Sequence, residues 1–126
     1  LSVAVLNLNN MRDEASDRKS GKNTIVVQMG GEKAKKYHYF LIITAMVVFV
    51  VFALLNNFNI DQYLFLVAYY PLVKHLDTVK KNTNPKELDP ELKKVALSTF
   101  LLSVLFSLCM IYFFSDVIVN TFMGGR

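Results

Sequence analysis

Two aspartates four residues apart are the strongest candidates for chemistry in this sequence. Asp13 and Asp17 follow an apolar stretch, and Asn9 lies four residues before Asp13. If the apolar helix continues through this segment, the three side chains lie on one face at i, i+4 and i+8. Two carboxylates in that arrangement repel each other unless a cation lies between them. Mg²⁺ binds one or two carboxylates together with water and phosphate oxygens, so Asp13 and Asp17 are predicted metal ligands, with an amide oxygen from Asn9 or Asn10.

The side chains beside the aspartates carry the groups that would bind a diphosphate. Arg12, Lys22 and Arg18 supply positive charge, and the Thr24 hydroxyl is a further donor. Gly21 permits the backbone to turn within this segment. Cationic and metal-binding groups at the end of an apolar stretch favour a substrate with a diphosphate head and an apolar tail.

The same charge pattern is also typical of a solvated helix next to a membrane. Glu14 and Arg18 form a favourable i, i+4 pair, and two aspartates at this spacing have low specificity as a motif. A phosphate-binding P-loop is excluded because Asn23 interrupts the Gly-Lys-Ser/Thr core. The residues by themselves therefore leave two interpretations open, a metal–diphosphate site and a structural helix.

Long uncharged runs place the chain in a membrane. Residues 37–60 and 95–115 contain no Asp, Glu, Lys or Arg, and about 20 apolar residues suffice to span a bilayer. We therefore predict an all-α, multi-span transmembrane helical bundle. Its expected parts are a partial helix at 1–8, an Asp-rich motif and loop at 9–30, and membrane helices at 37–55, 59–81 and 90–119. Because the chain opens on an apolar stretch without Met, residues 1–126 are expected to be the carboxy-terminal part of one longer domain.

Local signals refine the last two predicted helices. Pro71 is expected to kink the helix at 59–81. Asp89 is expected to cap the final helix, with Pro90 at its first helical position and Glu91 near the positive end of the helix dipole.

Basic residues alternate between the connecting segments. Residues 11–36 contain seven Lys and Arg, residues 56–61 none, and residues 74–94 six. By the positive-inside rule, the first and third segments face the cytoplasm, so we expect the Asp-rich motif on the cytoplasmic side of the cell inner membrane. The net charge of +4 comes from residues that flank apolar spans. The expected partner of that charge is the lipid bilayer and not a nucleic acid.

The segment around the aspartates resembles the second Asp-rich motif of the UbiA superfamily of intramembrane prenyltransferases. The matching pattern in residues 9–30 is NN-x-RD-xxx-DR-xx-GK-x-T-xx-V-xx-G. The paired asparagines and the Gly-Lys-x-Thr run are similar to the 1,4-dihydroxy-2-naphthoate polyprenyltransferase branch, which acts in menaquinone biosynthesis. Residues 89–97 are similar to the run before the last helix of that family. The resemblance implies a bundle of nine helices with two Asp-rich motifs, of which this chain would hold the second.

The resemblance implies a Mg²⁺-dependent enzyme. The full protein would transfer a polyprenyl group from polyprenyl diphosphate to 1,4-dihydroxy-2-naphthoate, with loss of CO₂ and diphosphate, giving demethylmenaquinone. Asp13 and Asp17 would be the catalytic metal ligands. The pocket residues that it implies are Arg12, Lys22, and Asn9 or Asn10. With one motif absent, the 126-residue chain alone is expected to be inactive. Alternatives are a 4-hydroxybenzoate or haem farnesyl transferase, or a non-enzymatic multi-span membrane protein.

The remaining histidines and tyrosines receive structural interpretations. His38 is expected at the membrane interface, beside the basic segment. His75 and Asp77 are two residues apart, so they do not share a helix face. Tyr69 and Tyr70 are typical of an interfacial aromatic belt, with a pocket for the aromatic substrate as the alternative.

Overall fold

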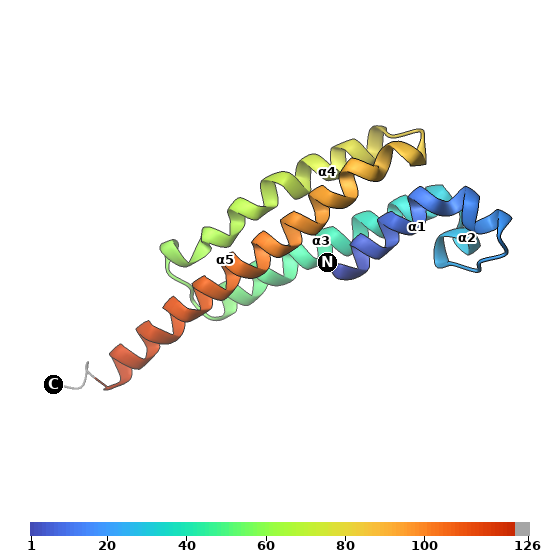
Figure 1. The fold of residues 1–126 in the computed structure, drawn as a ribbon. Helices are drawn as coiled ribbons and strands as arrows, with labels where there is room; N and C mark the ends of the chain where they lie inside the picture. The colour runs from blue at the N-terminus through green and yellow to red at the C-terminus, as the bar shows by residue number, and fades with distance from the viewer. Residues whose placement is uncertain (123–126) are drawn as a thin grey trace.

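All regular elements of residues 1–122, the part of the chain that the computed structural model describes, are helical (Figure 1). The predicted all-α class is therefore confirmed. In chain order the elements are α1 (Ser2–Lys19), α2 (Ile25–Met29), α3 (Gly31–Leu55), η1 (Ile60–Ala68), α4 (Tyr69–Lys81), η2 (Pro85–Leu88) and α5 (Asp89–Phe122), where η denotes a 3₁₀ helix.

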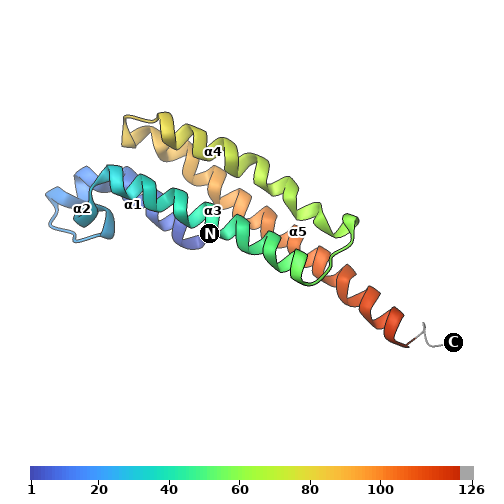
Figure 2. The same ribbon diagram turned by 180° about the vertical axis from the view of Figure 1, so that it is seen from behind.

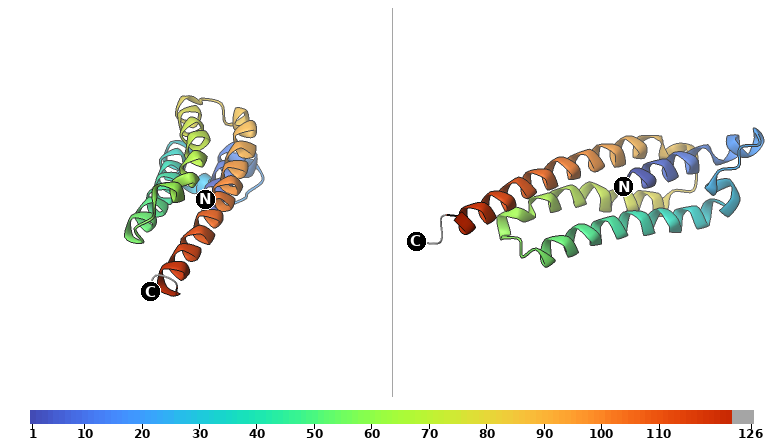
Figure 3. Two further views of the ribbon diagram at one scale, coloured as in Figure 1. Left: turned by 90° about the vertical axis from the view of Figure 1, so that its left-hand side faces the viewer. Right: turned by 90° about the horizontal axis from the view of Figure 1, so that it is seen from below.

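The long helices run side by side in an elongated bundle. α4 and η1 together follow α5, and α3 packs on α4, as views from the front and from behind both show (Figures 1 and 2). The shorter α1 packs against α3 and α5 over one half of the bundle. α5 extends past its neighbours toward its carboxyl end (Figure 3). This packing brings the Asp-rich motif next to the start of α5.

α1 continues without a break through the Asp-rich motif. Asn9, Asp13 and Asp17 therefore lie on one helix, as the spacing argument supposed. The backbone turns directly after the helix, where Gly21 has a φ of +73°, a left-handed conformation that glycine adopts without steric cost. The turn brings Lys22 back over the last turn of α1, and its backbone N–H donates to the Asp17 carbonyl at 2.9 Å.

The segment 59–81 is not the single kinked α-helix that was predicted. It begins as the 3₁₀ helix η1, where the Asn59 backbone N–H donates to Gln62 Oε1 at 2.9 Å, and it changes to α4 at Tyr69. Pro71, which lacks an N–H, lies in the first turn of α4, so the change of winding precedes it. Because a 3₁₀ helix rises about 2.0 Å per residue against about 1.5 Å for an α-helix, the segment extends roughly 37 Å.

The predicted cap of the last helix is wrong. Asp89 already has helical φ and ψ of −57° and −45°, because η2 leads directly into α5. The side chain that caps this helical run is that of Asn84, whose oxygen accepts from the Lys86 backbone N–H at 3.3 Å. The carboxylate of Asp89 is therefore available for a different contact.

Within residues 1–122, two helical stretches are long and apolar enough to cross a membrane, namely Gly31–Leu55 and Pro85–Phe122. Both begin earlier than predicted, because charged residues of the flanking segments are already helical. Their outer faces keep large apolar side chains such as Phe40, Val48 and Phe100 exposed. That pattern is typical of membrane-embedded helices and agrees with the predicted multi-span bundle.

The core changes in character along the bundle. Near the Asp-rich motif it is aliphatic and consists of Leu8, Met11, Val26, Ala34, Val79, Leu88 and Val95. A small cluster of Ala4, Ile42 and Leu72 follows. At the other end the buried residues are Ala53, Phe58, Phe65, Ala68, Leu102 and Cys109, surrounded by further aromatic rings. We call the part of the bundle that contains the Asp-rich motif and the aliphatic core the charged end, and the part that contains the buried rings the aromatic end.

Candidate functional site

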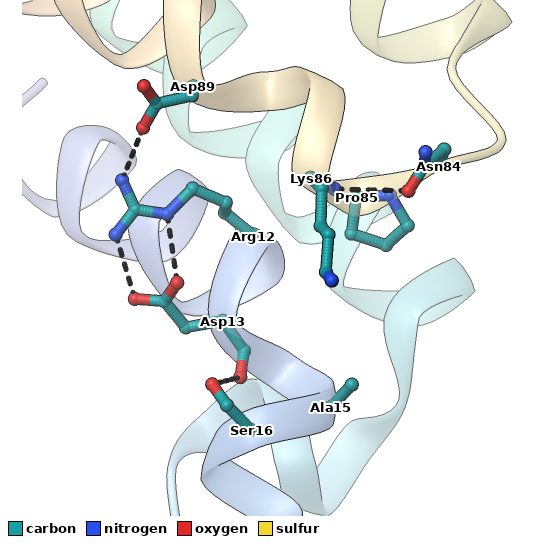
Figure 4. Close-up of a pocket in the computed structure, with 8 residues that line it drawn as sticks. All are labelled: Arg12, Asp13, Ala15, Ser16, Asn84, Pro85, Lys86 and Asp89. Carbon is teal, nitrogen blue, oxygen red and sulfur yellow. Dashed lines mark hydrogen bonds and ion pairs between the residues drawn. The ribbon is translucent and has the colours of Figure 1, made fainter.

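Arg12 connects α1 to α5 at the charged end. Its Nε and Nη2 donate to Asp13 Oδ1 and Oδ2 at 2.8 and 2.9 Å. Its Nη1 donates to Asp89 Oδ1 at 2.7 Å, across 77 positions of sequence. Figure 4 shows the guanidinium held between the two carboxylates. Planar pairing of this kind fixes the orientation of an arginine as well as its position.

A cavity of about 490 Å³ lies beside this cluster. Its lining residues are Arg12, Asp13, Ala15, Ser16, Asn84, Pro85, Lys86 and Asp89. The Lys86 side chain extends from η2 toward α1 (Figure 4), and among the described residues its ammonium has no ion-pair partner. The cavity thus offers one unpaired cation and an arginine that retains free N–H groups.

The sequence analysis did not predict the wall of the cavity that η2 and the start of α5 supply, whose polar residues are Asn84, Lys86 and Asp89. The available signal was the basic run at 74–94, together with the similarity of 89–97 to the segment before the last helix. Neither indicates that this segment would meet Asp13, because 76 residues separate Asp13 from Asp89 in the chain. That contact depends on the packing of α1 against η2 and α5.

Asp17 is buried in the last turn of α1 and is paired with a lysine. Only 5% of its surface is exposed, and Lys22 Nζ donates to its Oδ1 at 2.9 Å. The hydrogen bond to Asp17 raises the pKa of Lys22 above its ordinary value. Asp17 does not line the cavity beside Asp13, although both aspartates lie on α1.

The ionisation of Asp13 is governed by Arg12. The hydrogen bonds from Arg12, opposed by partial burial, lower the pKa of the Asp13 carboxyl below its ordinary value. The bonds to Asp13 and Asp89 in turn raise the pKa of Arg12. The pair therefore stays ionised at neutral pH, with a carboxylate at the cavity wall.

Two predicted diphosphate ligands have local structural partners. The Thr24 hydroxyl accepts from the Val27 backbone N–H at 3.2 Å and caps α2. Arg18 pairs with Glu14 at 2.9 Å and lies 3.4 Å from the Val27 carbonyl oxygen. The i, i+4 pair expected of a structural helix is therefore present, and neither residue lines the cavity.

The predicted amide ligands also lie away from the cavity. Asn9 lines a separate shallow hollow between α1 and α5, whose other lining residues are Ser2, Val5, Leu6, Leu92, Lys93 and Ala96. Asn10 is partly exposed and is not among the cavity residues. Of the predicted site residues, the packing brings Arg12 and Asp13 into the cavity and leaves the others around it.

The acidic residues fit part of a magnesium site. In residues 1–122 no three His, Cys, Asp or Glu side chains are close enough to hold a metal ion. Asp13 and Asp17 are carboxylates of the kind that Mg²⁺ binds in ones and twos, with phosphate oxygens and water as the other ligands. Asp13 is paired with Arg12 and Asp17 with Lys22, so a bound metal ion would have to replace part of these two ion pairs.

The sequence analysis did not predict a buried polar cluster of His38, His75 and Glu91. His38, expected at the membrane interface, is fully buried between helices, and its ring meets that of His75 with Nε2 atoms 2.7 Å apart. Glu91, expected only to favour the helix dipole, accepts from His75 at 2.6 Å. Sequence spacing excluded a His75–Asp77 pair correctly, but it carried no signal for contacts between three different helices.

The two tyrosines differ in environment. The Tyr69 hydroxyl donates to the Met46 carbonyl at 2.6 Å and packs in the aromatic end. Tyr70 is exposed, and its ring lies 4.5 Å from the Lys74 ammonium. Neither lines the cavity beside Asp13.

Two proteins with sequences similar to this chain have the same name, which states an enzymatic activity. The chain is 39% identical over 108 residues to 1,4-dihydroxy-2-naphthoate octaprenyltransferase of Haemophilus influenzae, and 38% identical to the protein of the same name from Escherichia coli. Each match covers 86% of this chain and 35% of the relative's length. No family model and no solved structure matches the chain. The similarity confirms the resemblance drawn from the Asp-rich motif.

Proposed function

We propose that this chain is part of an intramembrane prenyltransferase that transfers a polyprenyl group from its diphosphate to 1,4-dihydroxy-2-naphthoate. The reaction would release CO₂ and diphosphate and give demethylmenaquinone. The observation that carries the proposal is the 108-residue similarity to two enzymes named for this acceptor. The cavity at Arg12 and Asp13 supports it, because it joins a carboxylate to cationic groups at the end of apolar helices.

In this proposal Asp13 and Asp17 hold Mg²⁺, which supplies positive charge against the departing diphosphate. Arg12 has five N–H donors, and its bonds to Asp13 and Asp89 use three of them. The other two are free for phosphate oxygens. Lys86 and Lys22 add charge from either side of Asp13, and Lys22 can exchange its bond to Asp17 for one to the ligand.

The apolar parts of the chain suit the other half of the substrate. Gly31–Leu55 and Pro85–Phe122 would lie in the bilayer beside a polyprenyl tail, with their charged ends at its surface. Exclusion of water from that region protects a reactive allylic cation from hydrolysis. The basic counts of seven, none and six in successive segments favour the cytoplasmic side of the inner membrane for the cavity.

The test uses the purified full-length protein with polyprenyl diphosphate, 1,4-dihydroxy-2-naphthoate and Mg²⁺. We expect a prenylated, decarboxylated product, and we expect chelation of the metal to stop its formation. Transfer to 4-hydroxybenzoate instead would assign the alternative acceptor. Absence of transfer to any aromatic acceptor, with the protein folded, would overturn the proposal.

A second experiment tests whether the 126-residue chain holds the complete site. The chain spans 35% of the length of its relatives, and two carboxylates alone do not complete a magnesium–diphosphate site. We expect the 126-residue chain alone to be inactive, and to become active when the remainder of the protein is supplied as a separate chain. Turnover by the chain alone would show that a second Asp-rich motif is not required.

Membrane orientation has its own test. A single cysteine replaces Ile60 or Asn84 in a Cys109→Ser background, and intact cells are treated with a reagent that does not cross the membrane. Ile60 is 90% exposed and lies within residues 56–61, the segment that has no basic residues, so we expect labelling there and none at position 84. The opposite labelling would reverse the orientation.

A further inference from the structure

Side chains from three helices meet in a buried polar network next to the cavity. His38 of α3 and His75 of α4 are 0% exposed, and Glu91 of α5 is 5% exposed. The His38 and His75 rings meet edge to face, with their Nε2 atoms 2.7 Å apart. His75 Nδ1 lies 2.6 Å from Glu91 Oε2, and Lys94 donates to Glu91 Oε1.

The donor and acceptor capacities of these groups limit where the protons lie. An ionised Glu91 only accepts, so it receives hydrogen bonds from Lys94 and from Nδ1–H of His75. If His75 is neutral, its Nε2 accepts from Nε2–H of His38, and His38 Nδ1 is an acceptor that meets no donor among the described residues. If His75 is protonated at both nitrogens, His38 accepts from it and can direct an Nδ1–H to the Ala4 carbonyl, the backbone group that acts on this imidazole. Both arrangements keep the bond from His75 Nδ1–H to Glu91.

The first turn of α5 belongs to both the network and the cavity. Asp89 precedes Glu91 by two residues, so the two carboxylates point to different sides of the helix. Glu91 fastens this turn to α4 through His75, and His38 supports that histidine from α3. Asp89 fastens the same turn to Arg12 of α1 at 2.7 Å. A shift of the turn that loosens one contact therefore moves the other.

We propose that His38, His75 and Glu91 are positioning residues that fix the first turn of α5 and so hold Arg12 in the orientation that binds a diphosphate. The identity of that ligand rests on the proposed function. None of the three residues lines the cavity, so they act through Asp89 and do not contact the ligand. Buried carboxylate–histidine pairs that orient a binding group from behind have effects of this kind in metal sites.

The decisive variant is Glu91→Gln in the full-length protein. Glutamine keeps the shape but loses the charge, so its oxygen binds the Lys94 ammonium more weakly, and its NH₂ group can donate to His75 only if Nδ1 of that imidazole loses its proton. We expect the dissociation constant for inorganic diphosphate, measured by calorimetry without turnover, to rise about tenfold. Loss of a negative charge by itself would tighten the binding of an anion, so the direction of the change separates positioning from electrostatics.

The matched control is Glu87→Gln, the same chemical change at an exposed carboxylate four residues earlier. We expect unchanged or slightly tighter diphosphate binding there. A double-mutant cycle with Asp89→Asn then tests the route. If Glu91 acts through Asp89, the double variant binds no more weakly than Asp89→Asn alone, whereas independent damage to the fold would add. If Glu91→Gln does not fold, the same cycle is run with His38→Gln.

Two results separate this inference from the proposed function. If the wild-type protein binds no diphosphate, the proposed function fails. If it binds diphosphate but Glu91→Gln binds equally well, or if the double variant is additive, the positioning network alone is overturned. Imidazole ¹⁵N shifts of the wild-type protein give a check without ligand, since we expect His75 to be protonated at Nδ1, where it donates to Glu91. A His75 without a proton at Nδ1 would also overturn the network.

Discussion

The charged end and the aromatic end of the bundle both have an apolar core, but the charged end adds an ion pair between helices near its surface. There α1 and α5 share buried aliphatic residues such as Leu8 and Val95, and Arg12 pairs with Asp89, whose side chain is 70% exposed. At the aromatic end, η1 packs on α5 through rings such as Phe65 and Phe106, whose centroids are 5.5 Å apart. Charged groups near the surface can bind a ligand, whereas buried rings lose contact area if they move.

This difference suggests that the charged end serves ligand binding and the aromatic end serves stability. The proposed site must bind and release an anion, and the cavity beside Arg12 offers it the Lys86 ammonium and the two N–H groups of Arg12 that its carboxylate partners leave free. At the aromatic end, the buried side chains of η1, α3 and α5 pack on each other and hold these helices together. We therefore expect substitutions at the charged end to change binding and turnover, and substitutions at the aromatic end to change stability.

The largest expected effect is at the aspartates of the charged end. Asp13→Ala or Asp17→Ala in the full-length protein should lower turnover about 10³-fold or more, because each removes one of the carboxylates that we propose as Mg²⁺ ligands. The thermal midpoint should change little for Asp13, which is one-third exposed. Steady-state kinetics and thermal unfolding measure the two effects, and near-normal turnover in either purified variant would contradict the assignment.

The corresponding change at the aromatic end is Phe65→Ala. Phe65 is fully buried and contacts several rings, so we expect the free energy of unfolding to fall by about 3 kcal/mol. The affinity for diphosphate should stay as in wild type. Leu64→Ala, at a neighbouring position that is 52% exposed, is the control and should cost much less. A large loss of affinity in Phe65→Ala would show that the two ends are not separable.

Arg12→Lys tests geometry against charge. Lysine keeps the positive charge but cannot bond both carboxylates and a phosphate in one plane. We expect diphosphate binding to weaken about tenfold, or about 1.4 kcal/mol, with little change in stability. Titration calorimetry on the two proteins measures it. Wild-type affinity in this variant would mean that the orientation of the guanidinium is irrelevant to the site.

The smallest expected effect is the pH dependence of the Arg12–Asp13 pair. The pKa of Asp13 is lowered in the folded protein, so its contribution to stability is present above the unfolded pKa of about 3.9 and is lost as pH falls through the folded value. For an exposed pair this contribution is at most about 1 kcal/mol. Thermal unfolding of wild type and Asp13→Asn should differ slightly at pH 7, begin to converge below pH 4, and coincide once the pH is below the folded pKa of Asp13. A difference that grows on acidification would contradict the pairing.

Local features of the fold were predictable from the sequence because their causes are local. Uncharged runs identified the apolar helices, and the i, i+4 spacing placed Asp13 and Asp17 on one helix. Gly21 marked the turn. Errors arose where neighbouring elements fused, as when η2 ran into α5 and made Asp89 helical. The cap was assigned to Asp89 because the helix was expected to begin there, whereas the helical run begins earlier, at η2.

The helical class, the membrane character and the Asp-rich motif with its resemblance all follow from the order of the amino acids. These features depend on composition and on spacings of a few residues, which helix geometry converts directly into faces. The contact of Asp89 with Arg12, and those among His38, His75 and Glu91, depend instead on how the helices pack. Such contacts arise when the burial of apolar faces brings helices together, and the polar groups caught between them must then find partners. No local pattern records which residues those will be.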